Sequence, residues 1–99
     1  MKLYCKGDEV IMRSYIANGI SKNTEFFTSK RHAWKVETPM NLDESLVISA
    51  DIPNSVIDEH FANTTIKKNN DEVLVYTAKD NVKVYDNNIS FSAIKHLIT

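Results

Sequence analysis

Residues 45–61, SLVISADIPNSVIDEHF, contain the strand and the helix on which the predicted fold depends. In the first half, side chains alternate so as to predict a central strand with one apolar face, made of Leu46, Ile48, Ala50 and Ile52. Pro53 ends this strand because it has no N–H group to donate to a neighbouring strand. In the second half, Ser55 precedes Asp58 at the spacing of a capping box, and one helical face carries Val56, Ile57, His60 and Phe61. The stretch therefore predicts a central strand that leads directly into a short amphipathic helix.

The start of the chain predicts a strand followed by a helix. Residues 2–5 are apolar enough for a short strand, and Gly7 with Asp8 marks its end. Asp8 is also a candidate N-cap for a helix over residues 9–18, because its carboxylate can accept a hydrogen bond from a free N–H group of the first turn. Gly19 then ends the helix.

A second strand and helix are predicted before the central strand. Residues 24–28, TEFFT, have the β-branched and aromatic content of a strand. Thr28 or Ser29 can cap a helix that runs through Val36. The Thr-Pro pair within the polar connection of residues 37–44 ends this helix, since the residue before a proline avoids helical backbone angles.

The last third of the chain predicts mainly β-structure. Residues 64–68, 72–77 and 82–85 have strand patterns, and clusters of Asn, Asp and Lys between them are typical of turns. The tail is ambiguous between a strand and a short helix capped by Ser92, and the preferred interpretation is a strand over residues 89–91 followed by a helical turn. The order of elements indicates one α+β domain over residues 1–99, with a mixed or split antiparallel β-sheet and three short helices.

The composition excludes several classes of protein. At 42% hydrophobic and 25% charged residues, the 99-residue chain is typical of a globular domain. Twelve basic and 13 acidic residues give a net charge of −1, which argues against both a strongly basic nucleic-acid binder and an acidic DNA mimic. A single cysteine, Cys5, and the lack of a long apolar run predict a cytoplasmic protein without a disulfide or a membrane partner. A composition rich in Asn, Lys and Ile is typical of small phage accessory proteins.

Side chains able to bind metal or attack a substrate are scattered in the sequence. His32, His60 and His96 lie far apart and at no metal-ligand spacing, so no metal site is predicted. Cys5 with a distant histidine is one possible nucleophilic pair, and a small buried hydrophobe is the alternative.

One short segment combines basic residues with a tryptophan. Lys30, Arg31 and Lys35 surround Trp34, a pattern that nucleic-acid-binding surfaces use. In the alternative interpretation, Trp34 packs inward and the cations cover the solvent-exposed side of the helix.

The order of several short motifs resembles that of the ADP-ribosyltransferase fold, in which a split β-sheet grips NAD. The counterparts are LYCKG at residues 3–7, FFTS at residues 26–29 with Ala33 after it, VISADIP at residues 47–53, and DEVLV at residues 71–75. The chain departs from the family pattern where Cys5 follows Leu-Tyr in place of Arg or His, and where Asn70 replaces the first acid of a Glu-X-Glu pair.

This resemblance implies a site for each matched residue. Tyr4 and Lys6 would lie in the NAD cleft, with Lys6 near the nicotinamide, and Thr28 and Ser29 would support the ribose and the catalytic acid. Glu72 would be that acid, because a fixed negative charge stabilises the positive charge that grows on the ribose as nicotinamide departs. NAD is the implied cofactor, without a metal.

Two classes of function follow. In the first, the chain is a small ADP-ribosyltransferase-like protein that binds NAD or ADP-ribose and modifies a cellular target. In the alternative, it is a non-enzymatic, phage-type interaction protein that binds and inhibits a host protein, and nucleic acid is not its expected partner. Candidate anchors for such an interface are Tyr15, Trp34, Tyr76 and Tyr85, for which core packing is the competing interpretation.

Overall fold

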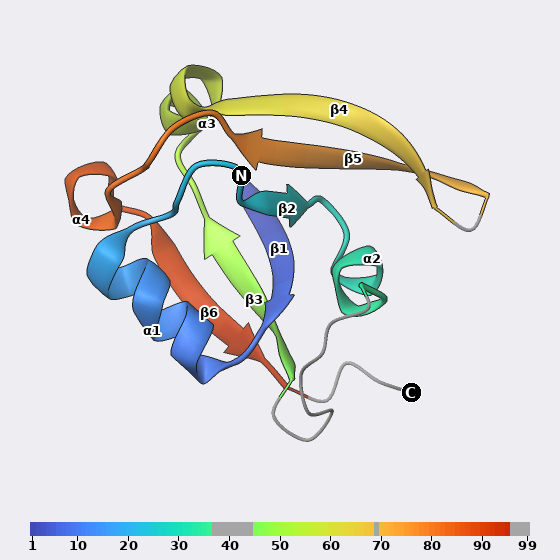
Figure 1. The fold of residues 1–99 in the computed structure, drawn as a ribbon, viewed down its shortest axis with the longest axis horizontal. Helices are drawn as coiled ribbons and strands as arrows, with labels where there is room; N and C mark the ends of the chain where they lie inside the picture. The colour runs from blue at the N-terminus through green and yellow to red at the C-terminus, as the bar shows by residue number, and fades with distance from the viewer. Residues whose placement is uncertain (37–44, 69, 96–99) are drawn as a thin grey trace.

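The computed structural model of the chain describes residues 1–36, 45–68 and 70–95. In chain order the elements are β1 (Lys2–Gly7), α1 (Glu9–Asn18), β2 (Glu25–Phe27), α2 (Lys30–Trp34), β3 (Leu46–Asp51), α3 (Asn54–His60), β4 (Phe61–Lys68), β5 (Asp71–Ala78), α4 (Val84–Asn87) and β6 (Ser90–Ile94) (Figure 1). They form one small α+β domain, as predicted. Within these ranges, the helices are too short to cross a membrane.

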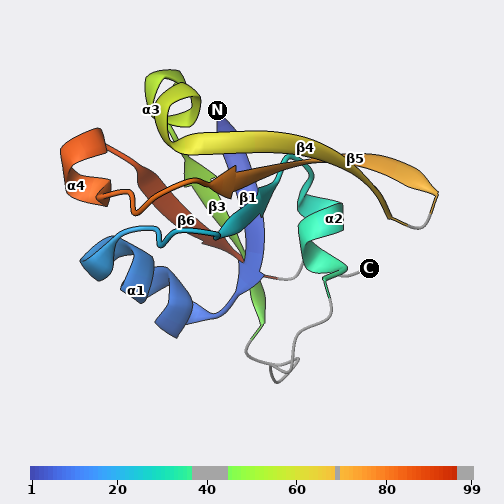
Figure 2. The same ribbon diagram turned by 45° about the horizontal axis from the view of Figure 1, so that its top comes forward.

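The six strands form one sheet that is narrow at its middle. The strand order is β4-β5-β2-β1-β3-β6, and every pair of neighbours is antiparallel rather than mixed. β1 pairs with β3 through six residues, but with β2 only through Tyr4 and Phe27. In Figures 1 and 2, β4 and β5 run across the direction of β1, β3 and β6. The sheet is therefore split into two halves that meet at a single residue pair.

The helices cover the two faces of the sheet unequally. The larger core lies on the face covered by α1, α3 and α4, and the smaller core lies on the face covered by α2. β3 has both faces buried: Leu46, Ile48 and Ala50 belong to the larger core, whereas Val47 belongs to the smaller one. The predicted apolar face of this strand, which continues to Ile52, is confirmed.

Side-chain caps define where the first two helices begin. The Asp8 carboxylate accepts a hydrogen bond from the Ile11 N–H at 2.8 Å, and α1 has the predicted bounds. The Ser29 hydroxyl accepts one from the His32 N–H at 3.4 Å at the start of α2. α2 ends at Trp34, earlier than predicted, and residues 37–44, with the predicted stop signal, lie outside the described residues.

The predicted capping box of the third helix is wrong. Pro53 occupies the N-cap position with a φ of −56°, and its carbonyl accepts hydrogen bonds from the N–H groups of Val56 and Ile57. Ser55 therefore lies inside α3, where it caps nothing. The helix ends at His60, so Phe61 begins β4 instead of continuing the helical face.

A fourth helix, α4, replaces the strand predicted over residues 82–85. Val82 forms only an isolated bridge with Ile20, and the chain then turns. The Asn87 side chain donates to the Lys83 carbonyl at 2.8 Å, and Asn88 adopts a left-handed conformation with φ of 56°. These local polar interactions stabilise a helical turn where alternation alone predicted a strand.

The predicted C-terminal strand is longer than expected. β6 begins at Ser90 and pairs with β3 through five residues, so the helical turn predicted near Ser92 is wrong as far as Ile94. Strand pairing gives these backbone groups partners that a helical turn would have to replace. Residues 96–99 lie outside the described residues.

The β4–β5 hairpin confirms the two strands predicted there and lengthens both. Opposite charges face each other near its tip, where Lys67 pairs with Glu72 and Lys68 with Asp71. Asn70 has a positive φ of 69°, as the turn chemistry predicted.

Two glycine substitutions test the backbone geometry. At Gly19, with φ of 86°, an added Cβ would lie 2.4 Å from the Val82 carbonyl oxygen; at Gly7 it would lie 2.7 Å from the Cδ1 atom of Ile48. We expect Gly19→Ala to lower the free energy of unfolding by about 2–4 kcal/mol, because backbone cannot move aside. Gly7→Ala should cost less, about 1–2 kcal/mol, because the clash is with the end of the buried Ile48 side chain and not with backbone. Urea denaturation measures the free energy of unfolding of both variants. Equal losses in the two variants would contradict the backbone clash inferred at Gly19.

Candidate functional site

A lysine lies over each ring of the Tyr4–Phe27 pair that joins the two halves of the sheet. The Lys30 ammonium lies 5.7 Å from the ring centroid of Tyr4, and that of Lys68 lies 5.5 Å from that of Phe27. A third pair, on the same side of the sheet, places the Lys6 ammonium 4.7 Å from the Trp34 ring. Significant cation–π pairs occur about once per 70–80 residues, so three pairs on one face of a 99-residue protein are more than expected. These residues are called the lysine–aromatic layer: Tyr4, Lys6, Phe27, Lys30, Trp34 and Lys68.

Secondary structure explains how the layer is assembled. Tyr4 and Lys6 share one face of β1 because strand side chains alternate, whereas Lys30 and Trp34 lie one turn apart on α2. The Lys6 ammonium donates to the Val36 carbonyl at 3.0 Å just after this helix. Three aromatic rings and three cations thus meet on the α2 side of the sheet.

A histidine–carboxylate pair lies between α2 and β5. The Nε2 atom of His32 is 3.4 Å from a carboxylate oxygen of Asp71, and the Nδ1 atom of His32 is buried without a hydrogen-bond partner. The pair has no signal in the sequence, because 39 residues separate its members. The contact shows that Asp71 points toward α2.

The sequence-predicted site residues lie on two faces of the sheet. Tyr4 and Lys6 come together in the lysine–aromatic layer, and Ser29 caps α2. The Thr28 hydroxyl and N–H both donate to the Leu74 carbonyl at 3.4 Å. Continuing the β2–β5 register by one residue therefore places Thr28 opposite Leu74, on the face away from α2.

Glu72 lies on the same face of β5 as Leu74. Its side chain is exposed, and its cross-strand neighbour is Lys67. Because it is two residues from Leu74, Glu72 is a diagonal neighbour of Thr28. The structure thus brings Thr28 close to Glu72, but it places these two residues on the opposite face from Tyr4 and Lys6.

Cys5 lies in the larger core, where it behaves as a small hydrophobe. Burial raises the pKa of its thiol to about 12, and a hydrogen bond with Tyr15 opposes this only partly. Burial, followed by the interaction with Cys5, also raises the pKa of the Tyr15 hydroxyl. A thiol that stays protonated is a poor nucleophile.

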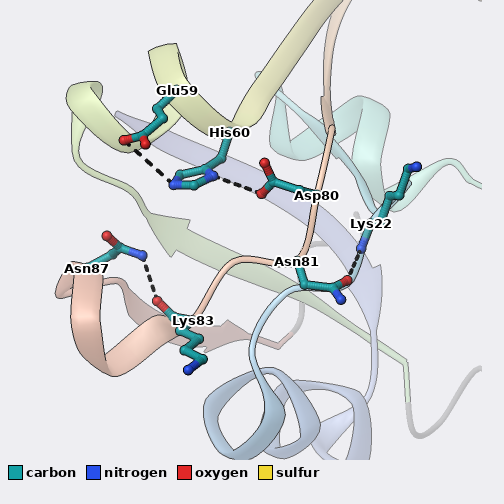
Figure 3. Close-up of polar contacts among 7 residues, drawn as sticks. All are labelled: Lys22, Glu59, His60, Asp80, Asn81, Lys83 and Asn87. Atoms are coloured by element: carbon teal, nitrogen blue, oxygen red, sulfur yellow. Dashed lines mark hydrogen bonds and ion pairs between the residues drawn. The ribbon is translucent and has the colours of Figure 1, made fainter.

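A second polar cluster joins α3 to the segment after β5 (Figure 3). The Nδ1 atom of His60 is 2.8 Å from a carboxylate oxygen of Asp80, and Nε2 is 3.7 Å from one of Glu59. The Lys79 N–H also donates to the His60 carbonyl at 2.8 Å. Both ring nitrogens face carboxylates instead of a nucleophile, so we interpret the cluster as structural. In the ranges that the structure covers, no three His, Cys, Asp or Glu side chains meet as a metal site would require.

The four predicted interface anchors differ in exposure. Tyr15 packs against Phe26 and Phe91, with ring centroids 6.2 and 5.8 Å away, and Tyr76 is buried. Trp34 is half-buried beside Lys6. Tyr85, on α4, is 70% exposed.

Comparison with known proteins gives no assignment: no family model, no curated protein and no solved structure matches the chain significantly.

Alkaline unfolding tests the state of Cys5. The unfolded chain releases the thiol proton near the ordinary pKa of 9.0, whereas the folded chain holds it to about 12. Stability is therefore full below pH 9 and falls as the pH rises, by about 1 kcal/mol between pH 9 and 10. Tyr15 adds a smaller loss in the same interval, because its ordinary pKa is 10.0 and burial raises it in the folded chain. Urea denaturation across this interval measures the loss of stability, and Cys5→Ala should remove the part that is due to the thiol. If the free energy of unfolding of the variant fell with pH as steeply as before, the raised pKa of Cys5 would be contradicted.

Proposed function

We propose that this chain is a compact ADP-ribosyltransferase-like protein that binds NAD or ADP-ribose at the lysine–aromatic layer and modifies a cellular target with the help of Glu72. The observation that carries the proposal is the position of the layer, directly over the residue pair where the sheet splits. The proposal rests also on the sequence motifs that resemble those of the ADP-ribosyltransferase fold.

The chemistry of the layer suits a dinucleotide. A nicotinamide or adenine ring would stack on Tyr4 or Trp34 in place of the lysine ammonium group that lies over each ring. Lys6, Lys30 and Lys68 supply the positive charge that a diphosphate group needs. A ligand with two planar rings joined by two phosphates satisfies both features.

The position of Glu72 suits the bond-breaking step. β5 extends past the end of β2, so Glu72 has β4 as its only strand neighbour among the described strands. A ribose bound near this open end of β2 would lie within reach of Glu72 only if the ligand passed from the face of the lysine–aromatic layer to the opposite face. The Glu72 carboxylate would there accept a hydrogen bond from a ribose hydroxyl and supply the negative charge that favours departure of nicotinamide, and Thr28 would help to orient Glu72.

NAD binding can be measured by calorimetry and by the fluorescence of Trp34, which is the only tryptophan. We expect saturable quenching with a dissociation constant between the micromolar and millimolar ranges. Lys30→Gln should raise this constant about five- to tenfold, because an ammonium near the diphosphate is lost. Lys22→Gln removes an exposed lysine elsewhere and serves as the matched control. Absence of saturable binding would leave the interaction-protein alternative.

Glu72→Gln separates catalysis from binding. We expect it to abolish transfer of ADP-ribose, measured as nicotinamide release, because the neutral amide no longer stabilises positive charge. The free energy of unfolding should change by less than about 0.5 kcal/mol, since the side chain is exposed. Glu25→Gln, an exposed glutamate on β2, is the matched control. Unaltered nicotinamide release would remove Glu72 from the mechanism.

The alternative of a non-enzymatic protein that binds a host protein stays a prediction. One observation favours it: Tyr85, a residue type common at the centres of interfaces, projects from α4 into solvent.

A further inference from the structure

A groove of about 430 Å³ lies beside α3, on the face of the sheet opposite the lysine–aromatic layer. One face of α3 supplies Asn54, Ile57 and Asp58, since these residues follow helical spacing. β4 and β5 supply a cross-strand pair, Asn63 and Tyr76, whose side chains lie on the same face of the sheet. Its volume is within the range of small-ligand pockets.

The floor and the rim of the groove differ in chemistry. Ile57 and the rings of Phe61 and Tyr76 are largely buried and form an apolar floor. Asn54, Asp58 and Asn63 are exposed and form a polar rim with one negative charge.

The polar side chains of the rim have no partner among the residues that the structure describes. Among the described residues, Asn54, Asp58 and Asn63 make no side-chain hydrogen bond or ion pair, and neither does the Tyr76 hydroxyl. Met1 also lines the groove, and its positively charged amino group is held by the Ile52 carbonyl at 2.8 Å and by the Asp51 carboxylate at 3.5 Å. The rim is therefore free to bind a ligand from outside.

We propose that this groove binds the arginine side chain of a partner protein. The aliphatic stem of an arginine packs on the floor, as long cationic side chains do on apolar surfaces. Its guanidinium group then donates to the Asp58 carboxylate and to the amide oxygens of Asn54 and Asn63. A planar head with five N–H donors matches these acceptors and the neighbouring rings better than an ammonium group does.

The inference does not depend on NAD binding. The groove and the lysine–aromatic layer lie on opposite faces of the sheet and share no residue. An exposed Asp58 side chain without a protein partner can also be changed without loss of the fold, so its role in binding is accessible to mutation.

The test uses three short peptides that differ only in their central residue. Acetyl-Gly-Arg-Gly-amide is the probe, the lysine peptide tests the head group, and the citrulline peptide keeps the shape but removes the charge. Binding is followed by NMR through the side-chain amide signals of Asn54 and Asn63. We expect the arginine peptide to bind with a dissociation constant on the order of 1 mM. The citrulline peptide should bind at least about tenfold more weakly, because an uncharged head gains no ion pair.

Two variants locate the site. Asp58→Asn should weaken binding of the arginine peptide at least about fivefold, because it removes the carboxylate of the rim while keeping its shape. Asp86→Asn removes an exposed carboxylate on α4, outside the groove, and should leave binding unchanged. Equal binding of the arginine and citrulline peptides or of the arginine and lysine peptides, an equal effect of the two variants, or no shift of the two asparagine signals would each overturn the proposal.

Discussion

The pairing of Tyr4 with Phe27 is the constraint on which the arrangement of this protein depends. It is the only residue pair through which β1 and β2 join the two halves of the sheet. Two adjacent phenylalanines on β2 connect the cores on either side of that junction. Phe26 is fully buried in the larger core, near Tyr15 and Phe61, whereas Phe27 belongs to the smaller core. A three-residue strand thus holds both layers together, which allows the halves to run in different directions.

Sequence periodicity predicted the elements whose stability is local or whose burial is strongly patterned. The apolar face of β3 and the capped helix α1 belong to this class, and so does the β4–β5 hairpin. The predictions of secondary structure that were wrong concern segments whose conformation depends on distant contacts or on details of the backbone. Residues 82–85 alternate like a strand, but Val82 finds only Ile20 as a partner, and the asparagines that follow close a helical turn. The N-cap is Pro53 and not Ser55, because the Pro53 carbonyl accepts the first backbone hydrogen bonds of the helix.

The candidate site was predictable in part. Alternation along β1 places Tyr4 and Lys6 on one face, and alternation along β5 separates Asp71 from Glu72, so the faces could have been assigned from the sequence alone. The residues that each of these side chains contacts could not be predicted from the sequence. Lys68 meets Phe27, and His32 meets Asp71, only because the hairpin folds over α2. Such contacts join segments about 40 residues apart and carry no local signal.

The near-zero net charge conceals an uneven distribution of charge. Twelve basic and 13 acidic residues cancel over the whole chain, which disfavours long polyanions as partners. Within the structure, however, three lysines gather over aromatic rings on one face, and an unpaired carboxylate rims a groove on the other. Interactions between exposed charges are screened beyond about 10 Å, so the charges of each surface affect only ligands bound close to them. The anionic ligand proposed for one face and the arginine side chain proposed for the other would therefore act at separate surfaces of one small sheet.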